Sequence, residues 1–247
     1  MLLTHPLPED RITDSRERAQ NYPPVRLQPS IDYHLSRARI VARYAGIEKK
    51  AALDWFDRTE KKRSTPEIVK PSFQYGRALV YLDENKPQEA EEILVKLKKQ
   101  DPYNNFYLDA LSDAYIALKQ PEKAQALLEQ SLRLKPNNAV LTINLANVHI
   151  RQEKYNEALK ILQRYTHEHP NDTIGWNLLS EANTHLGNSA EELAARAEIL
   201  ALRANWNKAI QYYTQASQLA PLGSLQQARF DARIDQLMVQ RERFLSL

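Results

Sequence analysis

The sequence contains no cysteine, which excludes disulfide bonds and thiolate sites. Glycine is scarce, with 5 in 247 residues, and this favours helix over strand and turn. No apolar run approaches the roughly 18 residues of a membrane-spanning helix, so direct membrane insertion is not expected. The formal net charge of +3 is small and no basic stripe carries interleaved aromatic residues, so nucleic acid is not an expected partner.

Groups that carry out catalysis are also missing. There is no nucleophile next to a base, no glycine-rich phosphate loop and no cluster of metal ligands. His167 and His169 flank Glu168, but a zinc site needs at least a third ligand and none is in view. This chain is therefore not expected to be an enzyme or to hold a cofactor of its own.

Prolines recur at a fixed interval in the middle of the sequence. Pro102, Pro136 and Pro170 follow one another at intervals of 34 residues. That is the length of the tetratricopeptide repeat (TPR), a pair of antiparallel helices that buries its apolar face only against a neighbouring pair. The sequence therefore predicts an all-α fold, a TPR helical solenoid with about four repeats, extra helices and a C-terminal capping helix.

Residue types at equivalent positions agree with two crossing helices. Small side chains stand where the helices of a unit approach most closely. They are Ala78 with Ala90, Ser112 with Ala124, and Ala146 with Ala158. Tyr81 and Tyr115 fill the space around this contact in two units, whereas His149 replaces the aromatic residue in the third. Arg77 replaces an apolar residue in the first unit, which predicts a partly exposed helix there.

The ends of the units are marked as well. Each proline of the 34-residue series pushes the residue before it out of the helical region, so a helix should end there. Two residues after these prolines stand Asn104, Asn138 and Asp172, which can accept hydrogen bonds from the free N–H groups of a new helix. Pro87 and Pro121 fit the first turn of the second helix, where a missing N–H costs little.

The period also sets the boundaries before residue 173. Residues 1–30 hold five prolines and many charges, so they are predicted to be a largely disordered linker with a short helix over 14–21. Residues 31–66 are predicted to form a degenerate opening repeat. The regular repeats are predicted at 71–104, 105–138 and 139–172.

Beyond Asp172 the period changes. Pro221 lies 51 residues after Pro170, which is one and a half units. The prediction is a three-helix terminal unit over 173–222, with helices at 173–186, 190–203 and 206–219. A capping helix is predicted over 224–245, because its apolar side chains form one stripe that can cover the end of the stack. The odd number of helices could also bend the array back on itself.

Four stretches carry a resemblance to known proteins. They are 4–12 (THPLPEDRI), 74–79 (QYGRAL), 192–198 (ELAARAE) and 223–237. They resemble a family of bacterial zinc metalloproteases with a His-Glu-x-x-His motif, in the branch whose catalytic domain is followed by a TPR array. The first stretch is similar to the segment that closes that catalytic domain.

The resemblance implies that this chain is part of a longer zinc metalloprotease. It places His5 near the zinc of the absent catalytic domain and implies a periplasmic location, although residues 1–4 do not resemble a signal peptide. The implied partners are outer-membrane β-barrel proteins, the complex that assembles them, and the protease domain itself. No two histidines here stand four apart with a glutamate between them, so this chain is not expected to hydrolyse peptides.

The first helices of stacked TPR units line a groove, and five positions of each unit point into it. In this sequence the surface contains Tyr75, Leu79, Leu82, Phe106, Asp109, Asp113, Ile116, Ile143, Asn144, Asn147, Ile150, Asn177 and Glu181. Asparagine amides can both donate to and accept from an extended peptide backbone, and aliphatic neighbours can take its side chains. The other interpretation is that these positions are solvated helix faces.

Two functions follow from this groove. In the first, the array is a protein–protein interaction module that brings barrel-protein clients or the assembly complex to the protease. In the second, it is a regulatory or structural domain that packs against its own protease domain in cis. An enzymatic function of this chain is the third hypothesis and has no residue that favours it.

Overall fold

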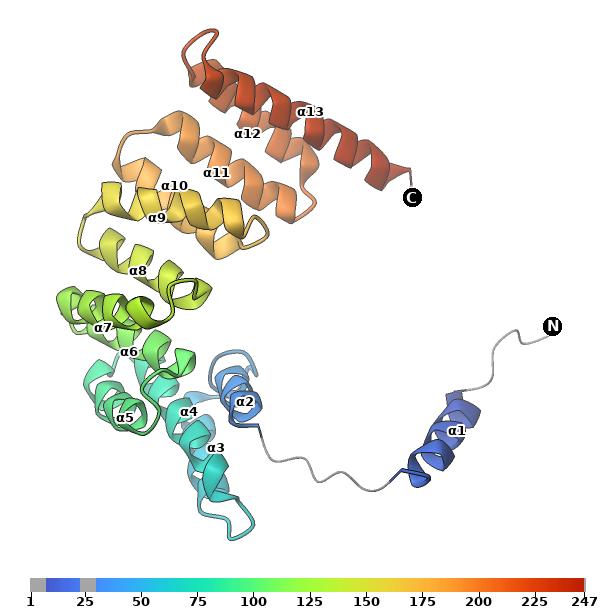
Figure 1. Cartoon of the computed structure of the whole chain (residues 1–247), viewed down its shortest axis with the longest axis vertical. Coiled ribbons are helices and arrows are strands. Elements are labelled where there is room, and N and C mark those ends of the chain that lie inside the picture. Colours follow the sequence, from blue (N-terminus) through green and yellow to red (C-terminus); the bar gives the residue numbers. More distant parts are fainter. Residues whose placement is uncertain (1–7, 23–29, 247) are drawn as a thin grey trace.

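A computed structural model describes residues 8–22 and 30–246 of the chain. Within these ranges the chain forms helices without any strand, in a curved stack, and this confirms the predicted fold (Figure 1). The elements are α1 (Pro8–Gln20), α2 (Ile31–Arg43), α3 (Lys49–Glu60), the 3₁₀ turn η1 (Glu67–Val69), α4 (Lys70–Asp83), α5 (Pro87–Gln100), α6 (Asn105–Ala117), α7 (Pro121–Leu134), α8 (Ala139–Arg151), α9 (Tyr155–Glu168), α10 (Thr173–His185), α11 (Ser189–Leu202), α12 (Trp206–Leu219) and α13 (Leu225–Leu245).

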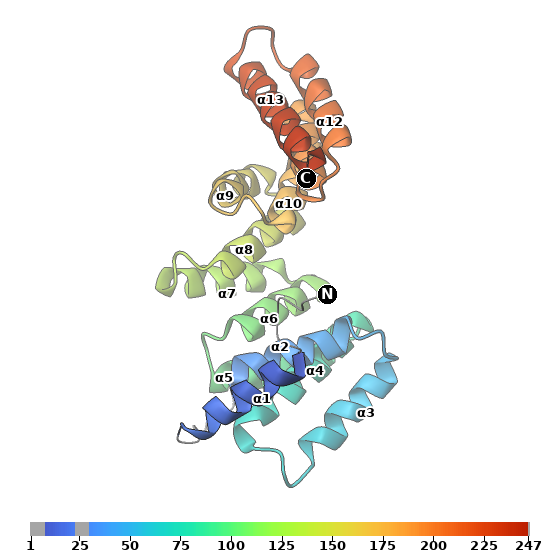
Figure 2. The same ribbon diagram turned by 90° about the vertical axis from the view of Figure 1, so that its right-hand side faces the viewer.

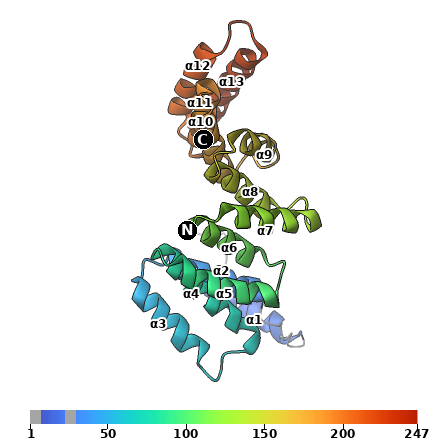
Figure 3. The same ribbon diagram turned by 90° about the vertical axis from the view of Figure 1, so that its left-hand side faces the viewer.

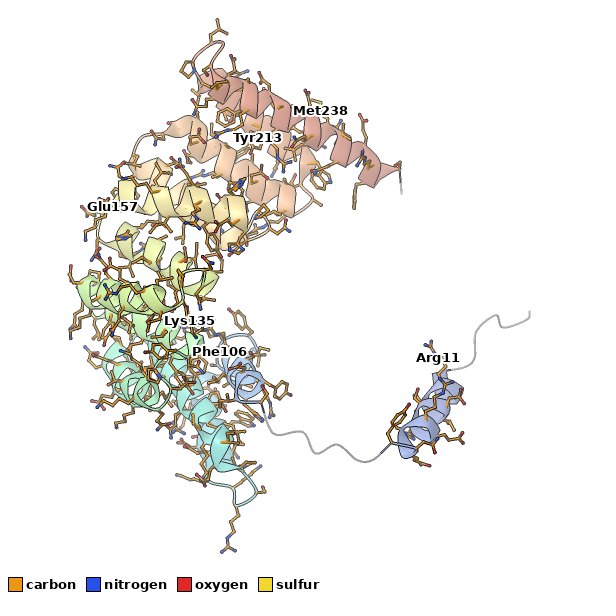
Figure 4. All side chains as sticks on the ribbon, in the orientation of Figure 1. Arg11, Phe106, Lys135, Glu157, Tyr213 and Met238 are labelled. Carbon is orange, nitrogen blue, oxygen red and sulfur yellow. The ribbon has the colours of Figure 1, made fainter. Side chains whose placement is uncertain are left out.

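The predicted linker is described only in part. Helix α1 covers more of it than the short helix predicted over 14–21, and residues 11–22 are all exposed. Figure 4 shows α1, marked by Arg11, apart from the rest of the array. His5 lies outside the described residues.

The three regular repeats are the pairs α4/α5, α6/α7 and α8/α9. All six small residues predicted at the close contacts are buried, each no more than 1% exposed. Gly76 of α4 likewise permits a close contact between helices, because a Cβ atom at this position would collide with the ring of Phe56 of α3. In Figure 3 the second helix α5 lies in front of α2, on the outer side of the stack.

Helix ends distinguish the first helix of a repeat from the second. The first helices α6, α8 and α10 each begin at a side-chain cap. The backbone N–H groups donate to the side-chain oxygens of the caps: Phe106 to Asn104 at 3.1 Å, Leu141 to Asn138 at 3.2 Å and Ile174 to Asp172 at 2.8 Å. The second helices α5, α7 and α9 begin without one. The three predicted caps are thus confirmed.

The turn between the first and the second helix has its own signature. Asn85, Lys119 and Glu153 adopt the left-handed conformation there, with φ between 58° and 59°. Gly187 adopts it after α10 with φ 72°, and Ala204 adopts it after α11 with φ 56°. Helix α11 therefore begins without a side-chain cap, like a second helix, and ends in the turn that follows a first helix.

Residues 31–66 differ from the paired helices expected of a degenerate repeat. Helices α2 and α3 each pack against α4 and barely touch one another. Helix α2 lies on the inner side of the curve, against the first helix of the first regular repeat (Figure 2). Leu35, Ala38 and Ala42 form its buried stripe. The first repeat is therefore covered by a helix of its own chain.

Candidate functional site

The predicted groove positions lie on one surface, called here the first-helix face, which α4, α6, α8 and α10 share. Its α4 end is closed. Tyr75 and Leu79, both predicted to line an open groove, are fully buried (each 0% exposed), because α2 packs over α4. These two residues offer no surface to a ligand, so their place in the predicted groove is corrected.

A polar network holds α2 on this face. Arg39 of α2 donates to the phenol oxygen of Tyr75 from Nε at 2.9 Å and from Nη2 at 2.7 Å. The same guanidinium forms an ion pair with Asp109 of α6. Asn144 of α8 donates from Nδ2 to the other oxygen of Asp109 at 2.8 Å. Three predicted groove residues are thus brought together, but around an arginine of the chain itself.

The surroundings of this network keep its groups in one protonation state. Burial raises the pKa of the Tyr75 phenol, although the Arg39 charge opposes the rise. The phenol therefore stays neutral and accepts from the guanidinium. The Arg39 guanidinium also lies over the ring of Phe106, 5.5 Å from its centroid, and Phe106 faces α2 in Figure 4. Cation, aromatic ring and carboxylate together fix the position of α2.

A second anchor lies at the end of α2. Asp83, at the end of α4, accepts from Arg43 at 3.2 Å and from Lys49 at 2.7 Å. Both cations near the end of α2 are therefore used within the chain.

Asp113, one helical turn after Asp109, is the carboxylate that these cations leave unpaired. It is partly buried and has no hydrogen bond or ion pair to any residue in 8–22 or 30–246. Burial, and then repulsion by Asp109, raises the pKa of Asp113 to about 7, while Arg43 and Arg39 act against the rise. Near neutral pH this side chain is therefore divided between its acid and its carboxylate form.

The first-helix face continues beyond α2 onto α8 and α10. Arg151 donates to Asn147 at 3.2 Å and to Glu181 of α10 at 2.6 Å, so it links two predicted residues. Ile143 and Ile150 are buried beneath them, at 8% and 3% exposure. Asn177 stays outside this set, because its amide donates to the backbone oxygen of Thr173 in its own helix at 2.7 Å.

The remaining predicted positions, Leu82, Phe106 and Ile116, are half-buried apolar residues packed against the core. The arginines on this face were missed by sequence reasoning. Arg39 and Arg43 stand four residues apart, beside the buried stripe of α2, and that spacing is the signal that places both on one helix face. No sequence interval connects them to acids 40 or 70 residues away.

Comparison with known proteins agrees with the fold. A family model described as tetratricopeptide repeat matches residues 115–182. The chain is a tetratricopeptide-repeat array. A solved tetratricopeptide repeat protein from Parabacteroides merdae is 13% identical, covers 93% of this chain over 91% of its own, and superposes with a TM-score of 0.51. A thermophilic TPR protein from Thermus thermophilus is 20% identical over 85% of this chain and 100% of its own, with a TM-score of 0.45.

Sequence relatives of this TPR array carry the name beta-barrel assembly-enhancing protease. The Escherichia coli K12 protein is 40% identical over 99% of this chain, which covers 49% of it. A Vibrio cholerae protein named after the same protease is 69% identical over all of this chain, which covers 51% of it. The predicted resemblance is confirmed, and the chain spans about half the length of these curated relatives.

The described helices are too short or too polar to cross a membrane. Residues 8–22 and 30–246 contain no cluster of three or more side chains able to hold a metal ion.

Proposed function

We propose that the array is a protein-interaction module that recruits polypeptide clients for a beta-barrel assembly-enhancing protease. Clients bind the first-helix face beyond the end of α2, over α6, α8 and α10. The observation that supports this most is that the face already holds a polypeptide segment. Helix α2 lies on it with an apolar stripe buried and one arginine paired to a carboxylate of α6.

The chemistry of the open part suits a polypeptide. Asn147 of α8 and Glu181 of α10 present polar atoms on this face, and the half-buried Ile116 of α6 can contact apolar side chains. From the name of the relatives, the proposed clients are unfolded outer-membrane β-barrel proteins and the complex that assembles them, met in the periplasm. Barrel strands alternate apolar and polar side chains, which fits a face of this mixed composition.

Site-specific crosslinking tests this proposal. A photoreactive amino acid replaces Asn147 on the first-helix face, and in a matched protein it replaces Asn156, which is exposed on the second helix α9. The expected result is that barrel proteins are captured from position 147 and not from position 156. Equal capture from both positions would remove the first-helix face from the proposal.

A second function is supported by the same helix. Because α2 shows that the first-helix face binds a segment of its own chain, the face can also hold the protease domain of its parent in cis. Mixing the separately produced protease domain with this array and measuring mass by light scattering tests this. A complex that Asn147→Arg dissolves supports packing in cis, whereas two unchanged monomer masses reject it.

A further inference from the structure

Helix α11 has two roles, and this creates a second binding surface. With respect to α10 it is a second helix, because the left-handed turn at Gly187 precedes it. With respect to α12 it is a first helix, because the same turn at Ala204 follows it. Repeat numbering restarted at 190 places Ala197 and Ala209 at the close contact, and both are fully buried. The face of α11 that would line a groove is therefore set by this second role.

The residues at the five groove positions of α11 are Glu191, Ala194, Ala195, Glu198 and Ala201. The first four line one cavity of about 660 Å³. The cavity lies between α9, α11 and α13, which stand in front of α10 and α12 in Figure 1. It is thus on the side of the array that carries the second helices, away from α2. A cavity of this size is within the range of about 300 to 1,000 Å³ typical of ligand pockets.

Helix α13 forms the far wall of this cavity, as the next first helix would. It begins at a side-chain cap, Ser224, like the first helices α6, α8 and α10. Arg233 of α13 donates to both oxygens of Glu198, at 2.7 and 2.8 Å, and Tyr213 donates to the same carboxylate at 2.6 Å. Arg229 donates to both oxygens of Glu191, at 2.6 and 2.7 Å. The same pairing of arginine with groove carboxylate holds α2 on the first-helix face.

These ion pairs decide what the cavity can accept. Each carboxylate and each guanidinium in the wall already has its counter-charge, so a charged group entering the cavity would lose hydration without gaining a partner. The floor, made of Ala194, Ala195 and Leu179, leaves room for a large side chain. Trp176 also lines the cavity, and its Nε1 donates to the backbone oxygen of Pro170 at 2.8 Å, which leaves the ring for apolar contact.

We infer that this cavity is a second polypeptide-binding site, which takes an extended segment by inserting one large uncharged side chain, aromatic or aliphatic, between α9 and α13. The amides of Gln163 and Gln236 at the two walls serve the backbone of that segment. The inference goes beyond the proposed function, because it concerns a different surface.

The test uses a short labelled peptide with a single phenylalanine between threonines, and a twin with alanine in its place. Binding to the array is followed by fluorescence anisotropy. Ala232 lines the cavity from an exposed position on α13, so Ala232→Trp fills the cavity without disturbing the core. Ala228, also exposed on α13 and outside the cavity, gives the matched control Ala228→Trp.

The expected result is that Ala232→Trp weakens binding of the phenylalanine peptide at least about tenfold, close to 1.4 kcal/mol. Ala228→Trp should leave binding of the phenylalanine peptide unchanged. The alanine peptide should bind the wild type at least as weakly as the phenylalanine peptide binds Ala232→Trp. Crosslinking from Asn147 should be the same in all three proteins, which separates this site from the first-helix face. Equal binding by the wild type and Ala232→Trp, or by the two peptides, would overturn the inference.

Discussion

A glycine on α4 sets how closely α3 can approach. The ring of Phe56, which is fully buried, occupies the space where a Cβ atom on Gly76 would stand. Gly76→Ala should therefore destabilise the fold by about 1–3 kcal/mol, as overpacking of a core does. Urea unfolding measures the change. Adding Phe56→Leu should recover part of the loss, and a double variant no better than Gly76→Ala alone would show that the ring is not the cause.

A single carboxyl group should make stability depend on pH. In the unfolded chain Asp113 titrates near its ordinary value, whereas in the fold its pKa is raised to about 7. The stability gained from the protonated form is thus complete below the unfolded pKa and is lost as the pH rises through the folded one. Asp113→Asn should match the wild type at low pH and exceed it at pH 8, with a gap that grows by up to about 1.4 kcal/mol per pH unit.

Urea unfolding of both proteins at several pH values between 4 and 8 checks this titration. A gap that stays the same at every pH would refute it.

The position of Asp113 on the first-helix face was predicted from its place in the repeat, but the absence of a cation paired with it was not predicted. That absence arises because Arg39, Arg43 and Lys49 pair with other acids, which only the folded structure brings near.

At the scale of elements, α2 depends on a few polar contacts. Arg39→Ala removes the partner of Tyr75 and of Asp109 together, so it should cost about 1.5–3 kcal/mol, as loss of a hydrogen bond to a charged group does. Arg37→Ala on the same helix is the control, since it removes only a contact with the ring of Trp55, at 5.2 Å. Hydrogen exchange should quicken in residues 31–43 for the first variant, and similar exchange in both variants would contradict this role.

Local signals made most elements predictable. Asn104, Asn138 and Asp172 mark helix starts through contacts that span only two or three residues, so they can be recognised in the sequence. The place of α2 rests on the pair between Arg39 and Asp109, 70 residues apart, and no periodic pattern contains such a pair. The second role of α11 can be recognised in the sequence, because counting back from Pro221 places Ala197 and Ala209 at the small positions of a unit, and both are buried in the structure.

At the scale of the whole array, the buried hydrophobic side chains of residues 30–246 divide into three clusters along the stack rather than one core. Arg233→Ala leaves Glu198, only 9% exposed and hydrogen-bonded to Tyr213 of the last cluster, without its cation. The loss should be about 3–5 kcal/mol and confined to α11, α12 and α13, because repeats contact only their neighbours. Hydrogen exchange resolved by residue measures it, and equal loss of protection in α4 and α5 would show that the array unfolds as one unit.

The half-unit step at α11 makes one helix part of two repeat units. A long unfolded chain that touched both surfaces would have to wrap around the edge of the molecule, held at two points that do not compete. Two weak contacts with one client chain raise the local concentration of that chain at each site and slow its dissociation. The segment between the two contacts stays exposed to whatever acts on it next.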